Sequence, residues 1–123
     1  MNLIWVYVAV VAVFGGLGAL LRFSLARWDG WLPWGILAAN TVASLIVGFA
    51  GHLVANTDQL VLQVALVFGF AGGLSTFSSW AAQTGGFVEA LKNRQAFLNA
   101  FLNLVLPVSA VFAGMLLGAF LLK

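Results

Sequence analysis

Charged side chains are scarce in this sequence: five Lys or Arg and three Asp or Glu make up only 7% of its 123 residues. A soluble domain carries roughly 25% charged residues, which cover its water-facing surface. Here 63% of the residues are hydrophobic, and the mean hydropathy is +1.11. We therefore expect an integral membrane protein. The small excess of positive charge forms no basic cluster, so nucleic acid is not an expected partner.

Cysteine is absent, which excludes disulfides, thiolate metal sites and cysteine nucleophiles. No nucleophile–base set and no pair of catalytic carboxylates is apparent either, so we do not expect an enzyme. No Asp, Glu or Lys lies deep in an apolar segment. This argues against a proton-coupled transporter, which usually needs a buried titratable group.

Four apolar segments are long enough to cross a membrane, which takes roughly 20 helical residues. They cover residues 3–25, 34–54, 59–91 and 97–122. No Lys or Arg precedes the first segment, so we interpret it as a retained helix and not as a signal peptide. Thr57 or Asp58 is a candidate N-cap for the third helix, and Pro107 predicts a kink in the fourth. The sequence thus predicts an all-α membrane protein, a single four-helix transmembrane domain over residues 1–123.

The third segment is too long for one straight span, and its composition changes in the middle. Residues 69–80 contain three glycines and four hydroxyl side chains. Irregular backbone at membrane depth persists only where protein buries it or where it lines a cavity. We therefore predict two half-helices that meet near residues 72–76, at an ion site.

The uncharged polar groups at membrane depth suit an anion. Hydroxyl and amide donors can replace part of a hydration shell without trapping the ion. Aromatic ring edges carry partial positive charge, so Phe77 and Trp80 can offer edges to a small anion. Asn40 has two equally weighted interpretations, an interhelical hydrogen bond or an anion contact. Arg22 is interpreted as a structural anchor near the end of its helix, and His52 as an interfacial residue.

Three motifs resemble those of the Fluc family of small four-helix fluoride channels. Residues 15–23 resemble its glycine–arginine signature, residues 39–48 its asparagine motif and residues 72–78 its helix break. The resemblance covers most of the chain. It implies a passive fluoride channel in the cell membrane that lowers cytoplasmic fluoride, built as an antiparallel, dual-topology dimer with two separate pathways.

The resemblance also implies roles for particular residues. A structural sodium ion, which is not transported, is expected at the dimer centre on the backbone carbonyls of Gly72 and Ser75. Arg22 corresponds to the arginine of the first motif. The residues assigned to the fluoride pathway are Asn40, Phe77, Ser78, Trp80 and Ser109.

Three positions depart from the family pattern. Trp80 stands where a second phenylalanine is usual, and its larger indole with an N–H donor predicts an altered or blocked pathway. Gln83 is neutral where glutamate is frequent, and Ser109 is the only clear hydroxyl of the fourth helix. These departures leave open another function, that of a non-conducting structural subunit of a heteromeric channel.

The basic residues are distributed unequally between the two sides of the membrane. Arg22, Arg27, Lys92 and Arg94 flank the first and third loops, and only Lys123 lies on the other side. The positive-inside rule then places these loops in the cytoplasm and both termini outside. A dual-topology homodimer requires almost no such bias. The hypothesis is that this chain pairs with an oppositely oriented paralogue, and self-pairing is the alternative.

The runner-up function is a small multidrug-type transporter, which shares the length, the four spans and the dual topology. That class requires a membrane-embedded carboxylate in the first helix. Residues 3–25 contain no Asp or Glu, and the sequence therefore favours the channel.

Overall fold

The computed structural model describes residues 2–56 and 59–123, and each regular element in this part of the chain is a helix. Four helical stretches are long and apolar enough to cross a membrane. They are α1 (Leu3–Leu25), α2 (Trp34–Asn56), a third span over Leu60–Glu89, and α6 (Asn93–Leu121). The predicted four-span, multi-pass membrane architecture is confirmed. Thr57 and Asp58, the candidate caps, lie outside the described residues.

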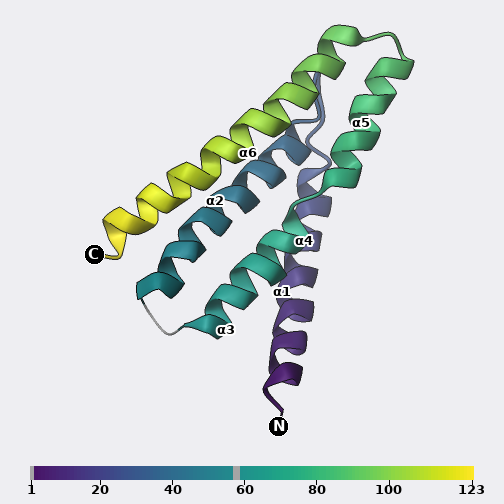
Figure 1. The fold of residues 1–123 in the computed structure, drawn as a ribbon. Coiled ribbons are helices and arrows are strands. Elements are labelled where there is room, and N and C mark those ends of the chain that lie inside the picture. The colour runs from purple at the N-terminus through teal and green to yellow at the C-terminus, as the bar shows by residue number, and fades with distance from the viewer. Residues whose placement is uncertain (1, 57–58) are drawn as a thin grey trace.

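The spans pack in an order that places α2 near the middle of the molecule (Figure 1). It lies along α6 on one side and against the third span on the other, and the third span packs in turn against α1. The α1–α2 and α5–α6 connections lie at one end. The N and C labels, the end of α2 and the start of α3 lie at the opposite end. The chain ends and the charged loops are therefore on opposite sides of the bundle.

The third span consists of several short elements. They are α3 (Leu60–Gln63), the π-helix η1 (Val64–Ala71), α4 (Gly72–Leu74) and α5 (Phe77–Glu89). Between α4 and α5 the backbone is extended, with φ −75° and ψ 152° at Ser75 and φ −152° and ψ 125° at Thr76. The predicted helix break is confirmed, and it consists of the two hydroxyl residues. Gly72 is helical, with φ −62° and ψ −39°.

Gly69 and Gly73 of the third span serve close packing instead. A methyl group on Gly73 would overlap the carbonyl oxygen of Gly15, and one on Gly18 would overlap that of Phe70. Backbone atoms cannot move aside as a flexible side chain can, so these positions require glycine. Close approach through small residues is the usual way in which helices associate in lipid. It brings α1 against the segment that precedes the break.

The buried core is built from small side chains around the break. Ala39, Ala43, Ala71 and Leu74 form a buried cluster between α2 and the third span. On the other side of α2, a methyl group on Gly48 would overlap a backbone carbonyl of α6. Since α2 is held closely on both sides, side chains on its inner face are positioned firmly against the break. The helix α6 continues through Pro107 without interruption.

Candidate functional site at the helix break

The extended backbone of Thr76 is held by the side chain of Asn40. The Thr76 amide donates to Asn40 Oδ1 at 2.7 Å, and Asn40 Nδ2 donates to the Thr76 carbonyl at 3.2 Å. The amide thus bonds both backbone groups of one residue, as a neighbouring β-strand would. Buried backbone groups at membrane depth must be paired. Asn40 therefore supplies from α2 the partners that the interrupted helix no longer provides, and the interhelical hydrogen bond considered for Asn40 is present.

Thr76 also starts the helix that follows the break. Its hydroxyl accepts a hydrogen bond from the Ser79 amide at 3.2 Å, which is the usual N-cap arrangement. The same hydroxyl lies 3.3 Å from the hydroxyls of Ser78 and Ser79. Thr76 is only 8% exposed. The sequence order Ser-Thr followed by Phe77 therefore ends one half-helix and caps the next.

Two backbone amides that would donate to carbonyls in a continuous helix donate to side chains here. In an α-helix, each carbonyl accepts from the amide four residues later. The Thr76 amide, which would reach the Gly72 carbonyl, bonds Asn40, and the Ser79 amide, which would reach the Ser75 carbonyl, bonds the Thr76 hydroxyl. Gly72 and Ser75 are both exposed on the surface of the single chain. Neither carbonyl therefore receives the amide that a continuous helix would supply.

Arg22 reaches the break from α1. Its Nη1 atom lies 3.5 Å from the Ser75 carbonyl oxygen, a long hydrogen bond. Arg22 is half-buried in the last turn of α1. A cation near the C-terminal end of a helix also interacts favourably with the helix dipole. This contact connects the end of α1 to the extended segment and suits the anchoring role considered for Arg22.

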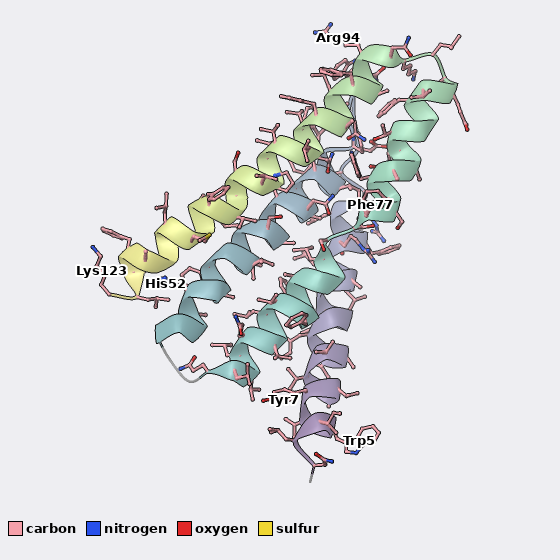
Figure 2. All side chains as sticks on the ribbon, viewed as in Figure 1. Trp5, Tyr7, His52, Phe77, Arg94 and Lys123 are labelled. Carbon is pink, nitrogen blue, oxygen red and sulfur yellow. The ribbon has the colours of Figure 1, made fainter. Side chains whose placement is uncertain are left out.

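The two aromatic residues after the break pack edge to face. The ring centroids of Phe77 and Trp80 are 5.1 Å apart, with an interplanar angle of 70°. Phe77 is 74% exposed, and Figure 2 shows it at the start of α5, between the Arg94 end and the Trp5 end of the molecule. The Trp80 indole N–H donates to the Asn99 carbonyl of α6 at 3.2 Å. The extra donor that distinguishes Trp80 from phenylalanine is therefore engaged with α6.

A line of side-chain hydrogen bonds continues from Asn40 into the seam between α5 and α6. Asn40 Nδ2 donates to Asn103 Oδ1 at 3.1 Å, and Asn103 Nδ2 donates to Asn99 Oδ1 at 3.2 Å. Asn99 Nδ2 then donates to Thr84 Oγ1 at 3.0 Å. We call these four residues, Asn40, Asn103, Asn99 and Thr84, the amide relay. Asn99 is 2% exposed, so the relay passes through the buried interior.

A hollow of about 490 Å³ lies directly beside the break. It is lined by Asn40, Ser44, Ser75, Thr76, Phe77, Trp80, Asn103, Leu104 and Pro107. Three of the predicted pathway residues, Asn40, Phe77 and Trp80, thus converge on one space. Ser78 does not line the hollow and reaches it through the Thr76 hydroxyl. Ser109 is exposed on α6 and is not among the lining residues.

Asn99 and Asn103 were not predicted from the sequence. Both are polar side chains inside a long apolar helix, and they are four residues apart, which places them on one helix face. Polar residues within a span usually face the protein interior. That spacing is the signal that identifies them. Pro107, four residues after Asn103, has no N–H to donate to the Asn103 carbonyl, and both residues line the hollow.

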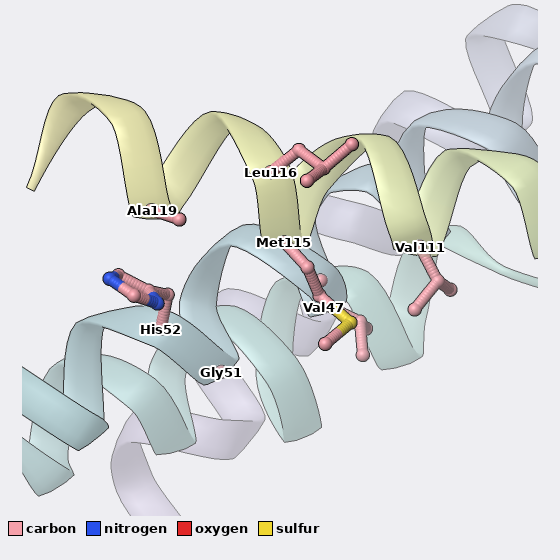
Figure 3. Close-up of a pocket in the computed structure, with 8 residues that line it drawn as sticks. Val47, Gly51, His52, Val111, Met115, Leu116 and Ala119 are labelled. Carbon is pink, nitrogen blue, oxygen red and sulfur yellow. The ribbon is translucent and has the colours of Figure 1, made fainter.

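Other hollows differ in chemistry from the one at the break. A hollow of about 160 Å³ between α2, η1 and α6 contains Ser44, Gly72 and Ser75. An apolar one of about 560 Å³ lies between α2 and α6 toward the C-terminus, beside His52 and Met115 (Figure 3). It has no set of hydroxyl and amide donors, so we do not assign the ion pathway to it.

Gln83, the neutral residue noted in the sequence, lies near the charged loops. Its Oε1 atom is buried and has no hydrogen-bond partner among the described residues. It borders a hollow of about 300 Å³ that Asp29 and Lys92 also line. An amide oxygen accepts hydrogen bonds and does not donate them. In this orientation Gln83 presents an acceptor to its surroundings, as a glutamate would.

Comparisons with known proteins identify the family of this chain. The family described as "CrcB-like protein, Camphor Resistance (CrcB)" matches residues 9–115. A relative from Agrobacterium fabrum, named fluoride-specific ion channel FluC, is 35% identical over 121 residues, which is 90% of this chain and 94% of the relative. A relative of the same name from Syntrophotalea carbinolica is 35% identical over 124 residues, 95% of this chain and 98% of the relative. One from Variovorax paradoxus is 43% identical over 82 residues, 62% of this chain and 65% of the relative. Because the match spans all four helices, this chain belongs to the CrcB family of membrane proteins.

Proposed function

We propose that this chain is a subunit of a fluoride-selective channel, through which fluoride leaves the cell down its gradient. The observation that carries the proposal is the hollow at the break, on which Asn40, Phe77 and Trp80 converge. The names of the full-length relatives support the same ion.

The chemistry of the hollow suits the conduction of a small anion, which must bind weakly enough to be released. Its polar lining consists of hydroxyl, amide and backbone groups, and its lining residues include no charged side chain. Conduction requires binding sites weak enough to release the ion. The positive edges of Phe77 and Trp80 add attraction without a fixed charge. Phe77 is the more exposed of the pair, so we assign it the first contact with the ion.

We also propose that the working channel contains two copies, arranged antiparallel. The exposed Gly72 and Ser75 lie in the middle of a span, where lipid cannot satisfy backbone polar groups. A second copy that covers this surface would remove the carbonyls from lipid. The sequence leaves open whether the second copy is this chain or an oppositely oriented paralogue.

A structural sodium ion fits the same surface. Interrupted helices in membrane proteins coordinate Na⁺ through unwound backbone carbonyls, and the donors that would bond the Gly72 and Ser75 carbonyls are used elsewhere. We propose these two oxygens as the ligands from each copy. The ion would supply positive charge that holds carbonyls of two chains together. Arg22 would share the Ser75 oxygen and limit repulsion between chains.

The alternatives have less support. A small multidrug-type transporter lacks its required carboxylate in α1, since residues 3–25 contain no acidic side chain. A non-conducting subunit is favoured by one observation, namely that both Nδ2 hydrogens of Asn40 are already donated, to Thr76 and Asn103. Fluoride flux through the purified chain distinguishes that alternative from the channel.

The test is fluoride efflux from liposomes that contain only this purified chain, followed with a fluoride electrode. We expect efflux well above that of empty liposomes and negligible chloride efflux under the same gradient. Phe77→Ile should abolish fluoride efflux, because it removes the aromatic edge from the hollow while the residue stays apolar.

Phe120→Ile is the matched control, since Phe120 is 73% exposed and Phe77 is 74% exposed, but Phe120 lies far from the break near the end of α6. It should conduct as the unmodified chain does. Unchanged efflux in Phe77→Ile would show that the assigned pathway is wrong. Robust efflux from the lone chain would exclude an obligatory paralogue.

A further inference from the structure

The amide relay has a fixed direction. The Thr76 amide can only donate, so the Asn40 side chain must present its oxygen there and its nitrogen toward Asn103. Asn103 must therefore offer its oxygen to Asn40, and its nitrogen then faces Asn99. At that end the Asn99 backbone carbonyl, which can only accept, lies 3.0 Å from Asn103 Nδ2. Backbone groups at both ends thus determine the orientation of every amide between them.

Asn99 holds Asn103 with both its backbone and its side chain. Its backbone carbonyl accepts from Trp80 Nε1 as well as from Asn103 Nδ2, and its side-chain nitrogen donates to Thr84 Oγ1. It is almost fully buried. A buried amide that loses its partner is costly, so it reorients to find another. Reorientation of Asn99 would turn its nitrogen toward Asn103 Nδ2, so Asn103 would keep the Asn99 backbone carbonyl as an acceptor and lose Asn99 Oδ1. A less firmly held Asn103 would in turn hold Asn40 Nδ2 less firmly.

We propose that Asn99 and Thr84 are positioning residues of the fluoride pathway, acting on Asn40 through Asn103. Neither of them lines the hollow at the break. Their role is to hold Asn103 firmly in place, so that its Oδ1 accepts from Asn40 Nδ2 and steadies the Asn40 amide beside the hollow. This inference rests on the proposed function for its effect on flux, and on hydrogen bonds alone for the coupling between Thr84 and Asn40.

The first arm of the test measures fluoride efflux in liposomes. Thr84→Val removes the hydroxyl that accepts from Asn99 and keeps the side-chain volume, whereas Thr84→Ser keeps the hydroxyl. We expect Thr84→Val to lower efflux roughly tenfold, the effect of one unpaired buried group, and Thr84→Ser to restore it. Ser24→Ala is the control, because the Ser24 hydroxyl bonds only the Leu20 carbonyl of its own helix in α1, and it should leave efflux unchanged.

The second arm does not depend on conduction. The side-chain NH₂ resonances of Asn40, assigned in ¹⁵N-asparagine-labelled protein, should shift in Thr84→Val and stay in place in Thr84→Ser. A purely local packing defect at Thr84 would not move them. Thr84→Ala, which removes the same acceptor from a smaller side chain, should reproduce both effects if Thr84→Val folds poorly.

The two arms separate the inference from the function on which it rests. Absence of efflux from the unmodified chain would contradict the proposed function, and the resonances of Asn40 would still decide the coupling. Equal efflux in Thr84→Val and Thr84→Ser, with unchanged Asn40 resonances, would overturn the inference.

Discussion

At the scale of single residues, Asn40 is the side chain that bonds both backbone groups of Thr76 at the break. It accepts from the Thr76 amide and donates to the Thr76 carbonyl and to Asn103. The structural interpretation of Asn40 is thus present in the structure. An anion contact would require one Nδ2 hydrogen to leave Thr76 or Asn103.

Asn40→Asp is expected to reduce fluoride efflux by more than tenfold. The aspartate keeps the acceptor for the Thr76 amide, but it loses both donated bonds and directs oxygen at two oxygens, the Thr76 carbonyl and Asn103 Oδ1. Leaving buried groups unpaired costs roughly 1–3 kcal/mol each, and a negative charge beside the pathway repels an anion. Efflux from liposomes and the midpoint of thermal unfolding in detergent should both decrease.

The matched control is Asn93→Asp, the same chemical change at the exposed first residue of α6. A negative charge in the first turn of a helix is favourable, so its stability and efflux should be retained. If Asn40→Asp conducted as well as Asn93→Asp, the Asn40 amide would have no part in the pathway.

Trp80 shows what residue identity alone leaves undetermined. Its larger indole with an N–H donor was expected to alter or block the pathway. The sequence does not indicate where that donor points. In the structure the donor bonds the Asn99 carbonyl, and the ring packs edge to face with Phe77. The partner lies 19 positions away in the chain, on a helix whose register against α5 cannot be read from composition.

At the scale of elements, the break was predictable in position but not in cause. Glycine and hydroxyl residues indicated an interruption near residues 72–76, and the structure places it at Ser75 and Thr76. The glycines suggested weak helix, yet Gly73 is needed for contact with α1. Capping by Thr76 follows a local sequence rule, whereas the clamp by Asn40 depends on how α2 packs against the third span.

The contact between α1 and the third span predicts that alanine substitution affects stability differently at two glycines of these helices. Gly73→Ala should destabilise the protein by several °C in thermal unfolding, because its methyl group meets the Gly15 backbone, and overpacking costs roughly 1–3 kcal/mol. Gly16→Ala is the control, since a methyl group there meets nothing within 4 Å. It should be neutral or slightly stabilising through its better helix propensity. Equal midpoints for the two variants would contradict the packing described for α1.

At the scale of the whole molecule, a single chain leaves the candidate site at the break uncovered. Gly72, Ser75 and Phe77 are all exposed in a span that should lie at membrane depth. The basic residues gather at the loop end: Arg27 lies over Phe23 and Arg94 over Trp31, at 5.2 and 5.5 Å from the ring centroids. Figure 2 shows Arg94 and Lys123 at opposite ends. An antiparallel second copy of this chain would place a basic loop end on each side of the membrane. The predicted orientation bias argues against that arrangement, so self-pairing and pairing with an oppositely oriented paralogue both stay open.

The surface around Gly72 provides the last prediction, which concerns assembly. A side chain on Gly72 has room within its own chain, because the nearest atom to an added methyl group is the Val67 carbonyl oxygen at 3.5 Å. Gly72→Leu should therefore leave the single chain folded and prevent a second copy from approaching the break. We expect the dimer fraction, measured by single-molecule photobleaching counts in liposomes, to decrease with a dissociation constant raised at least tenfold, or about 1.4 kcal/mol.

Two comparisons make that prediction specific to the break and to its ion. Gly85→Leu, on α5, adds the same side chain where nothing lies within 4 Å, and it should dimerise normally.

Replacing Na⁺ by N-methylglucamine should weaken the dimer of the unmodified chain, because the Gly72 and Ser75 carbonyls of two copies would then face one another without a cation between them. It should have little further effect on Gly72→Leu, whose copies no longer bring those carbonyls together. A Gly72→Leu dimer as tight as that of Gly85→Leu would show that the interface lies elsewhere on the molecule. Equal dimerisation in Na⁺ and in N-methylglucamine would show that sodium does not stabilise the interface.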